Sequence, residues 1–120
     1  MWVCFLISYF IATVYSTDVY VQEGSTVTIL CSLRAVNIRW FGPLLAQAYT
    51  DGTTINPNLN VEILSRLNVT GNNIIGEFNL QITSFQHNDY GRYYCQFVNG
   101  SILSEDHFLK MKVLLLEKQS

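Results

Sequence analysis

Residues 89–95 read Asp-Tyr-Gly-Arg-Tyr-Tyr-Cys (DYGRYYC), and this stretch decides the fold. It holds a cysteine that needs a partner, a glycine that gives the backbone room, and tyrosines whose large rings need a place to pack. Tyr93 and Cys95 are two residues apart, so in a β-strand both side chains point to the same face. The stretch therefore indicates a strand whose buried face carries one half of a disulfide.

Composition limits the classes of protein that fit. The chain has 120 residues, of which 49% are hydrophobic and 13% are charged, and its formal net charge is -2. These values indicate one globular domain rather than a disordered chain. Because no run of basic residues occurs, the sequence does not indicate a nucleic-acid-binding protein or one that binds an anionic membrane surface.

The first sixteen residues, MWVCFLISYFIATVYS, contain no charged side chain and end in a small residue. This pattern is typical of a secretory signal peptide cleaved after Ser16, although the basic residue expected near its start is missing. An uncleaved anchor and an ordinary buried strand are the alternatives. We therefore expect a signal peptide at 1–16, a domain at 17–116 and a tail at 117–120, in a protein that is secreted, or is at the cell surface if this chain is a piece of a longer one.

Cleavage would remove Cys4 and leave two cysteines, Cys31 and Cys95. Two cysteines in a secreted domain of this size usually form one disulfide, and a free reactive thiol is the alternative. The bond would close a loop of roughly 64 residues, for which the chain-entropy model gives on the order of 4 kcal/mol.

Alternation of apolar and polar residues recurs along the chain and predicts half-buried strands. Val27, Ile29 and Cys31 share one face of one such stretch, and Phe78, Leu80 and Ile82 share one face of another. Turn residues separate these stretches, and Asn99-Gly100 is a strong signal for a two-residue hairpin. The sequence therefore predicts an all-β, two-sheet antiparallel sandwich.

The sandwich places the opening stretch in context. Trp40 follows Cys31 by nine residues and shares an inward face with Ile38, so it would pack against the disulfide. Tyr93 can turn its ring inward and return its hydroxyl to the backbone of the preceding loop, which is a tyrosine corner.

Together these residues resemble the immunoglobulin superfamily, and the V-set branch in particular. The family motif Asp-x-Gly-x-Tyr-x-Cys is matched at every fixed position by Asp89, Gly91, Tyr93 and Cys95. The resemblance covers about 17–116. It implies a variable-type domain with extra C′ and C″ strands, which the stretch 48–55 (AYTDGTTI) fits best.

The resemblance also implies that Arg66 pairs with Asp89, and the alternative is two unrelated surface charges. Two departures from antigen-receptor domains stand out. The strand-C glutamine is absent after Trp40, and the last strand has no Phe-Gly-x-Gly bulge. The sequence therefore resembles a non-rearranging V-set protein.

Catalytic motifs do not occur in the sequence, so we expect no enzyme, no cofactor and no small-molecule substrate. His87 and His107 stand apart on polar stretches, and we expect exposed or edge residues rather than metal ligands, because a zinc site needs three or four converging ligands. Two sequons, Asn68-Val69-Thr70 and Asn99-Gly100-Ser101, predict N-glycosylation at Asn68 and Asn99.

The remaining hypothesis is protein binding. In V-set proteins the sheet of strands G, F, C and C′ is the usual contact face. The residues expected to point outward from it are Arg39, Phe41, Tyr94, Gln96, Phe108 and Lys110. Aromatic residues and arginine dominate interface energetics, although the neighbouring C′ strand and the PLLAQ segment at 43–47 could instead cover these rings.

We therefore expect a binding module for another protein, with a role in immune modulation or cell-surface recognition. A homophilic adhesion module, in which the partner is the protein itself, and a virus-encoded soluble decoy are the alternatives. An enzyme or small-ligand carrier would need a pocket with converging polar groups.

Overall fold

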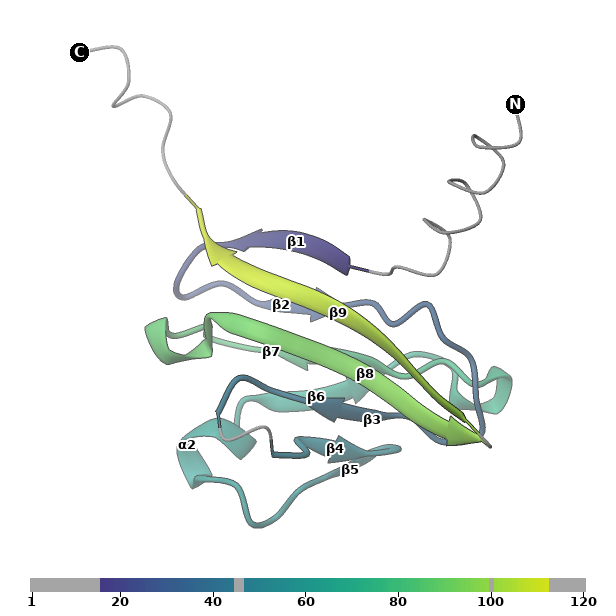
Figure 1. Ribbon diagram of the computed structural model, residues 1–120. Coiled ribbons are helices and arrows are strands. Elements are labelled where there is room, and N and C mark those ends of the chain that lie inside the picture. The colour runs from purple at the N-terminus through teal and green to yellow at the C-terminus, as the bar shows by residue number, and fades with distance from the viewer. Residues whose placement is uncertain (1–15, 45–46, 100, 113–120) are drawn as a thin grey trace, which may run out of the picture.

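A computed structural model describes residues 16–44, 47–99 and 101–112, and these form a sandwich of two β-sheets (Figure 1). The first, which we call the front sheet, contains four strands in the order β1 (Ser16–Val21), β9 (Ser101–Met111), β8 (Gly91–Asn99) and β3 (Arg39–Phe41). The second, the back sheet, contains β2 (Val27–Ile29), β7 (Asn79–Ile82) and β6 (Leu67–Thr70). The predicted all-β sandwich is confirmed.

The strand pairings are antiparallel except for β1, which runs parallel to β9. A small hairpin of β4 (Thr50–Asp51) and β5 (Thr54–Ile55) lies beside β3 and is linked to it by a bridge between Phe41 and Ala48. Helical structure in the described residues is short: α2 (Val61–Leu64) and the 3₁₀ helices η1 (Asn73–Ile75) and η2 (His87–Asp89).

The core lies between the sheets and follows the alternation seen in the sequence. The fully buried side chains include Ile29, Ile38, Trp40, Leu80, Ile82 and Tyr93. Leu30, on the opposite face from Ile29, is exposed, as period-two geometry requires.

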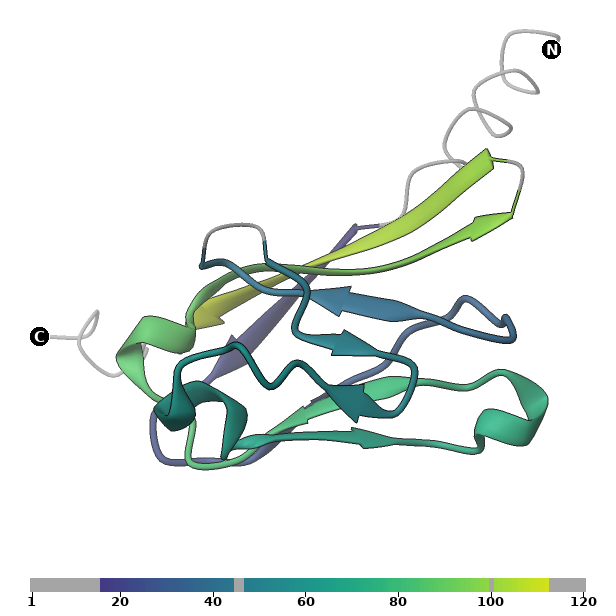
Figure 2. The same ribbon diagram turned by 90° about the horizontal axis from the view of Figure 1, so that it is seen from below.

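The two long strands β8 and β9 form a hairpin that continues past the short strand β3 (Figure 2). The last β3–β8 pair joins Arg39 and Gln96, whereas β8 runs on to Asn99. The front sheet is therefore narrower at this end than at its middle.

Some predictions fall outside the described residues. Ser16 begins β1, and the rest of the predicted signal peptide and the tail at 117–120 are not described. Within the described residues, no helix is long and apolar enough to cross a membrane.

Candidate binding face

The disulfide between Cys31 and Cys95 is present and joins the two halves of the sandwich, with the Cα atoms 6.2 Å apart. Trp40 is completely buried, and its indole Nε1 donates a hydrogen bond to the Phe78 carbonyl oxygen at 3.1 Å. Because Trp40 is paired directly with Cys95 across β3 and β8, the ring and the disulfide share one layer of the core. The predicted covalent connection is confirmed.

The opening stretch forms the corner that leads into β8. The Tyr93 hydroxyl donates to the Asp89 carbonyl oxygen at 2.7 Å, and burial raises the pKa of this hydroxyl. Gly91 has a φ of +142°, and a Cβ atom there would lie 2.7 Å from Cβ of Pro43. Only glycine fits such a backbone conformation and such a close approach without strain.

Arg66 and Asp89 form an ion pair on the same corner. The Arg66 Nη2 atom lies 3.0 Å from Asp89 Oδ1, and Nη1 contacts the second carboxylate oxygen. The backbone amide of Gln86 also donates to this carboxylate, at 2.8 Å. The two side chains are 11% and 6% exposed, so this pair belongs with buried rather than surface ion pairs.

The structure corrects one expectation, because His107 is buried rather than exposed or at an edge. Its Nε2 lies 2.9 Å from Oε1 of Glu105, and its Nδ1 lies 2.7 Å from the Thr17 hydroxyl. His87 is exposed as expected, 3.4 Å from Glu23. The polar sequence around His107 predicted an exposed side chain. The imidazole is buried instead because partners on β1 and β9 satisfy the hydrogen bonds of both its nitrogens.

Glu105 is the second buried polar residue of β9. Its carboxylate accepts hydrogen bonds from the Ser32 amide at 3.0 Å and from the Ser32 hydroxyl. Burial on its own would raise the pKa of Glu105, but the hydrogen bonds from Ser32 and His107 together outweigh it and hold the pKa below its ordinary value. This cluster connects the front sheet to the chain that follows β2, so we assign it to the fold.

The outward surface of the front sheet, here called the front face, carries the six residues predicted for binding. Arg39 is directly opposite Gln96, and Phe41 is directly opposite Tyr94, on β3 and β8. Arg39 and Lys110 are exposed, whereas the other four, Phe41, Tyr94, Gln96 and Phe108, are partly buried. The three aromatic residues of this set are thus partly buried, as the alternative interpretation of partly covered rings requires.

The rings of Phe41 and Tyr94 are stacked, with centroids 4.8 Å apart and planes 8° apart. The guanidinium carbon of Arg92 lies over the Tyr94 ring, 4.4 Å from its centroid, and makes a cation–π contact with it. Sequence reasoning missed Arg92, although it occurs in the opening stretch two residues before Tyr94 and therefore on the same face. The three side chains make one ordered cluster at the centre of the front face.

The front face carries three ion pairs, one of which includes Arg92 of this cluster. Arg92 pairs with Asp106 at 2.9 Å, Lys110 with Asp18 at 3.1 Å, and Arg39 with Asp51 at 3.4 Å. All six partners are at least partly exposed, so each pair contributes little to stability. Their arrangement balances positive and negative charge across the face.

Comparison with known proteins agrees with this geometry. A protein-family model described as "Immunoglobulin domain" matches residues 17–104. The chain belongs to the immunoglobulin domain family. A search of the curated proteins finds no match to this immunoglobulin domain.

Solved structures that resemble this immunoglobulin domain share the fold at low sequence identity. The first immunoglobulin domain of Dpr11, bound to DIP-gamma, superposes with a TM-score of 0.66 and 18% identity, over 79% of this chain and 97% of that one. The first immunoglobulin domain of mouse SynCAM 2 gives 0.65 and 16%, over 79% and 90%. The RIG-5 first-domain homodimer gives 0.61 and 15%, over 84% and 92%.

Metal chemistry has no suitable ligand set in the described part of this immunoglobulin domain. The one cluster of potential ligand atoms there contains Cys31, Cys95 and Glu105. The two sulfur atoms are joined in the disulfide, so neither can bind a metal as a thiolate.

The two sequons lie in different sheets. Asn68 is exposed on β6 of the back sheet. Asn99 is the last residue of β8 and is paired with Ser101, the first residue of β9, at the end of the long hairpin. Strands β8 and β9 therefore pair as a hairpin, and the predicted two-residue turn at Asn99-Gly100 includes Gly100, which lies outside the described residues.

Proposed function

We propose that this immunoglobulin domain is a V-set-type module that recognises another protein through the front face. The observation that carries the proposal is the stacked pair of Phe41 and Tyr94 with Arg92 lying over the ring. The variable-type assignment is supported by the β4–β5 hairpin, which lies within the stretch 48–55 expected to form the C′ and C″ strands, and by the bridge that connects this stretch to β3.

Energetics favour this cluster as the centre of an interface. In protein interfaces, some residues cost about 2 kcal/mol or more of binding free energy when they are truncated to alanine. Aromatic and arginine side chains are enriched among them. Because stacking already fixes Phe41 and Tyr94 in the free domain, these two side chains lose little conformational entropy when a partner packs on them. Both residues are only partly buried, so part of each remains accessible to a partner.

Complexes of similar domains support a protein partner. The Dpr11 domain is bound to DIP-gamma, and the RIG-5 domain forms a homodimer. We infer that the partner of this domain is likewise a protein, such as an immunoglobulin-like receptor or ligand. The setting is extracellular, secreted or at the cell surface, and the role is cell-surface recognition or immune modulation.

Glycosylation at Asn68 is compatible with binding at the front face. Asn68 belongs to the back sheet and is exposed, so a glycan there would point away from the front sheet. We propose that Asn68 and Asn99 both carry N-glycans, with the second one at the end of the β8–β9 hairpin.

The test is capture of partners from cell-surface extracts by the purified domain. We expect the double variant Phe41→Ala, Tyr94→Ala to lose the captured protein. The double variant Val36→Ala, Ile74→Ala is the matched control, because it removes two highly exposed apolar side chains outside the front face, one before β3 and one on η1. Equal capture by the native domain and the front-face variant would overturn the proposal.

A homophilic adhesion module is the second candidate. The balanced ion pairs of the front face favour it, since two copies of a face with no excess charge do not repel each other. Sedimentation over a range of concentrations distinguishes the two, because a domain that stays monomeric at high concentration argues against self-association.

A further inference from the structure

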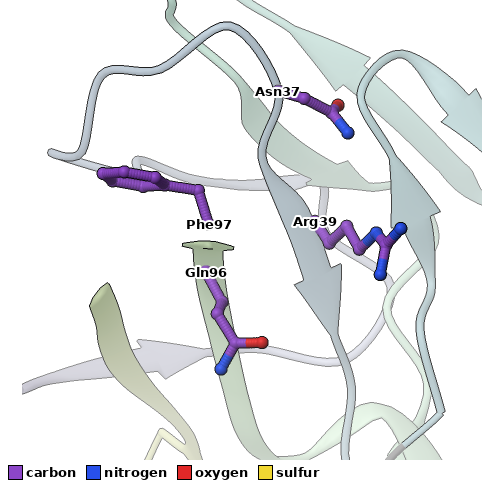
Figure 3. A pocket seen from close by; sticks show the side chains of 4 residues that line it. All are labelled: Asn37, Arg39, Gln96 and Phe97. Atoms are coloured by element: carbon purple, nitrogen blue, oxygen red, sulfur yellow. The ribbon is translucent and has the colours of Figure 1, made fainter. Parts of the chain in front are cut away.

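A recess of about 180 Å³ opens at the edge of the front face, lined by Asn37, Arg39, Gln96 and Phe97. Figure 3 shows Gln96 and Phe97 on the same strand and Asn37 and Arg39 on the neighbouring segment, with the Phe97 ring pointing away from the other three side chains. The recess forms where β3 begins while β8 continues, so one side of β8 has no neighbouring strand there. Arg39 and Gln96 are each two residues from the stacked rings, so the recess adjoins the central cluster.

Polar groups with unused hydrogen-bonding capacity line this recess. Among the described residues, Arg39 contacts an acid only through Nε, 3.4 Å from Asp51 Oδ1, and its two terminal nitrogens donate to no protein atom. The side-chain amide of Gln96 likewise makes no hydrogen bond within the described residues. Donors are therefore available to a group that enters from outside.

Arg39 is also the least firmly paired cation of the front face. Its pair with Asp51 is longer than the Arg92–Asp106 pair at 2.9 Å and the Lys110 pair at 3.1 Å. Both Arg39 and Asp51 are more than half exposed, at 58% and 56%, so little free energy opposes separation of the two. Asp51 would keep the hydrogen bond that Asn37 donates to it at 2.6 Å.

We propose that this recess is the socket for an acidic side chain, aspartate or glutamate, of the protein partner. Arg39 turns from Asp51 and donates both terminal nitrogens to the incoming carboxylate, the paired geometry that guanidinium groups favour. The Gln96 amide donates a further hydrogen bond to the same carboxylate. This inference rests on the proposed function, since it names what the partner inserts beside the aromatic cluster.

The test uses a probe that needs no identified partner. The acid probe is N-acetylglutamate with its α-carboxyl group blocked as the methylamide, so that the side-chain carboxylate is its single charge. It is titrated into isotope-labelled domain, and the side-chain signals of Arg39 Nε and of the Gln96 amide are followed by NMR. The corresponding N-acetylglutamine methylamide, which has the same shape and no charge, is the control ligand. We expect saturable shifts at these signals with the acid, and affinity at least tenfold weaker with the amide.

Two arginine variants assign the effect to the recess. Arg39→Gln is expected to weaken binding of the acid probe about tenfold or more. Arg34→Gln removes the same charge from the loop after β2, where Arg34 lies 3.6 Å from Glu77, and should leave binding unchanged. A dispersed NMR spectrum shows that each variant is folded. Equal shifts with acid and amide, or equal loss in both variants, would overturn the proposal.

The outcome is separable from that of the proposed function. In one outcome the acid probe binds at Arg39, but Phe41→Ala, Tyr94→Ala does not reduce partner capture. That result would support the socket and reject the aromatic cluster as the binding site. Loss of capture in that double variant, with no binding of the probe at Arg39, would keep the face and reject the socket.

Discussion

The buried ion pair of Arg66 and Asp89 allows the sharpest test of how this domain is held together. We consider Arg66→Met, which keeps the aliphatic stem, Asp89→Asn, which keeps the shape of the side chain, and the double variant. Each single change leaves a charged partner in a site where the two side chains are only 11% and 6% exposed. Breaking a buried pair in this way costs about 3–5 kcal/mol of unfolding free energy.

The double variant removes both charges, so it no longer leaves either one unpaired. We expect the double variant to be at least as stable as the less stable of the two single variants. The sum of the two single costs then exceeds the cost of the double variant by about 3 kcal/mol, which is the coupling energy of the double-mutant cycle. The assay is urea unfolding with the disulfide intact. With an m-value of about 1–3 kcal/mol/M, each single variant should lower the midpoint by about 1–5 M.

The matched control is the exposed pair of Lys110 and Asp18, whose side chains are 49% and 47% exposed. The corresponding cycle of Lys110→Met and Asp18→Asn should give a coupling energy below about 1 kcal/mol. Single costs that simply add for Arg66 and Asp89, within about 0.5 kcal/mol, would refute the reasoning that burial couples these two charges.

Three further variants test other parts of the fold. Glu105→Gln should be less stable than the native domain at pH 7, and the difference should shrink below about pH 4.3. The pKa of Glu105 is lower in the folded than in the unfolded state, so its carboxylate stabilises the fold above the unfolded-state pKa. That stability is lost as the pH falls through the folded-state pKa. A difference that is unchanged in urea unfolding at pH 3 would contradict this. Tyr93→Phe removes the hydroxyl that donates to Asp89, at an expected cost of about 1–3 kcal/mol, and an unaltered urea midpoint would argue against the corner. Gly91→Ala forces a side chain onto Pro43 at positive φ, so the melting temperature should fall, and an unchanged value would show that the backbone is not constrained there.

Much of the core could be predicted because it depends on local patterns. Alternation alone assigned Ile29, Leu80 and Ile82 to the inside, and the spacing of Tyr93 and Cys95 placed both on one face. These predictions succeed because each strand has one buried face, which fixes the direction of every second side chain.

The error at His107 has a physical reason. His107 and Glu105 alternate in step with the buried Leu109, so the pattern pointed inward while their polarity pointed outward. Their burial is compensated by Thr17 and Ser32, which are far away in the sequence. Local periodicity contains no information about such partners.

The sequence predicted which residues point outward from the candidate binding face, but not which of them contact each other. The outward positions of Phe41 and Tyr94 follow from alternation, whereas their stacking depends on the register of β3 against β8. The pairing of Arg39 with Asp51 depends in addition on where the β4–β5 hairpin lies. A single sequence specifies neither the register nor the position of that hairpin.

Affinity for the captured partner tests the central claim most directly. The dissociation constant is measured for the native domain, for Tyr94→Ala, and for the control Ile74→Ala on η1. An interface centred on the Tyr94 ring predicts weakening of at least about tenfold for Tyr94→Ala, equivalent to about 1.4 kcal/mol, and no change for Ile74→Ala. Unchanged binding by Tyr94→Ala, together with loss of binding by Ile74→Ala, would contradict the claim and move the interface to the loop end of the domain.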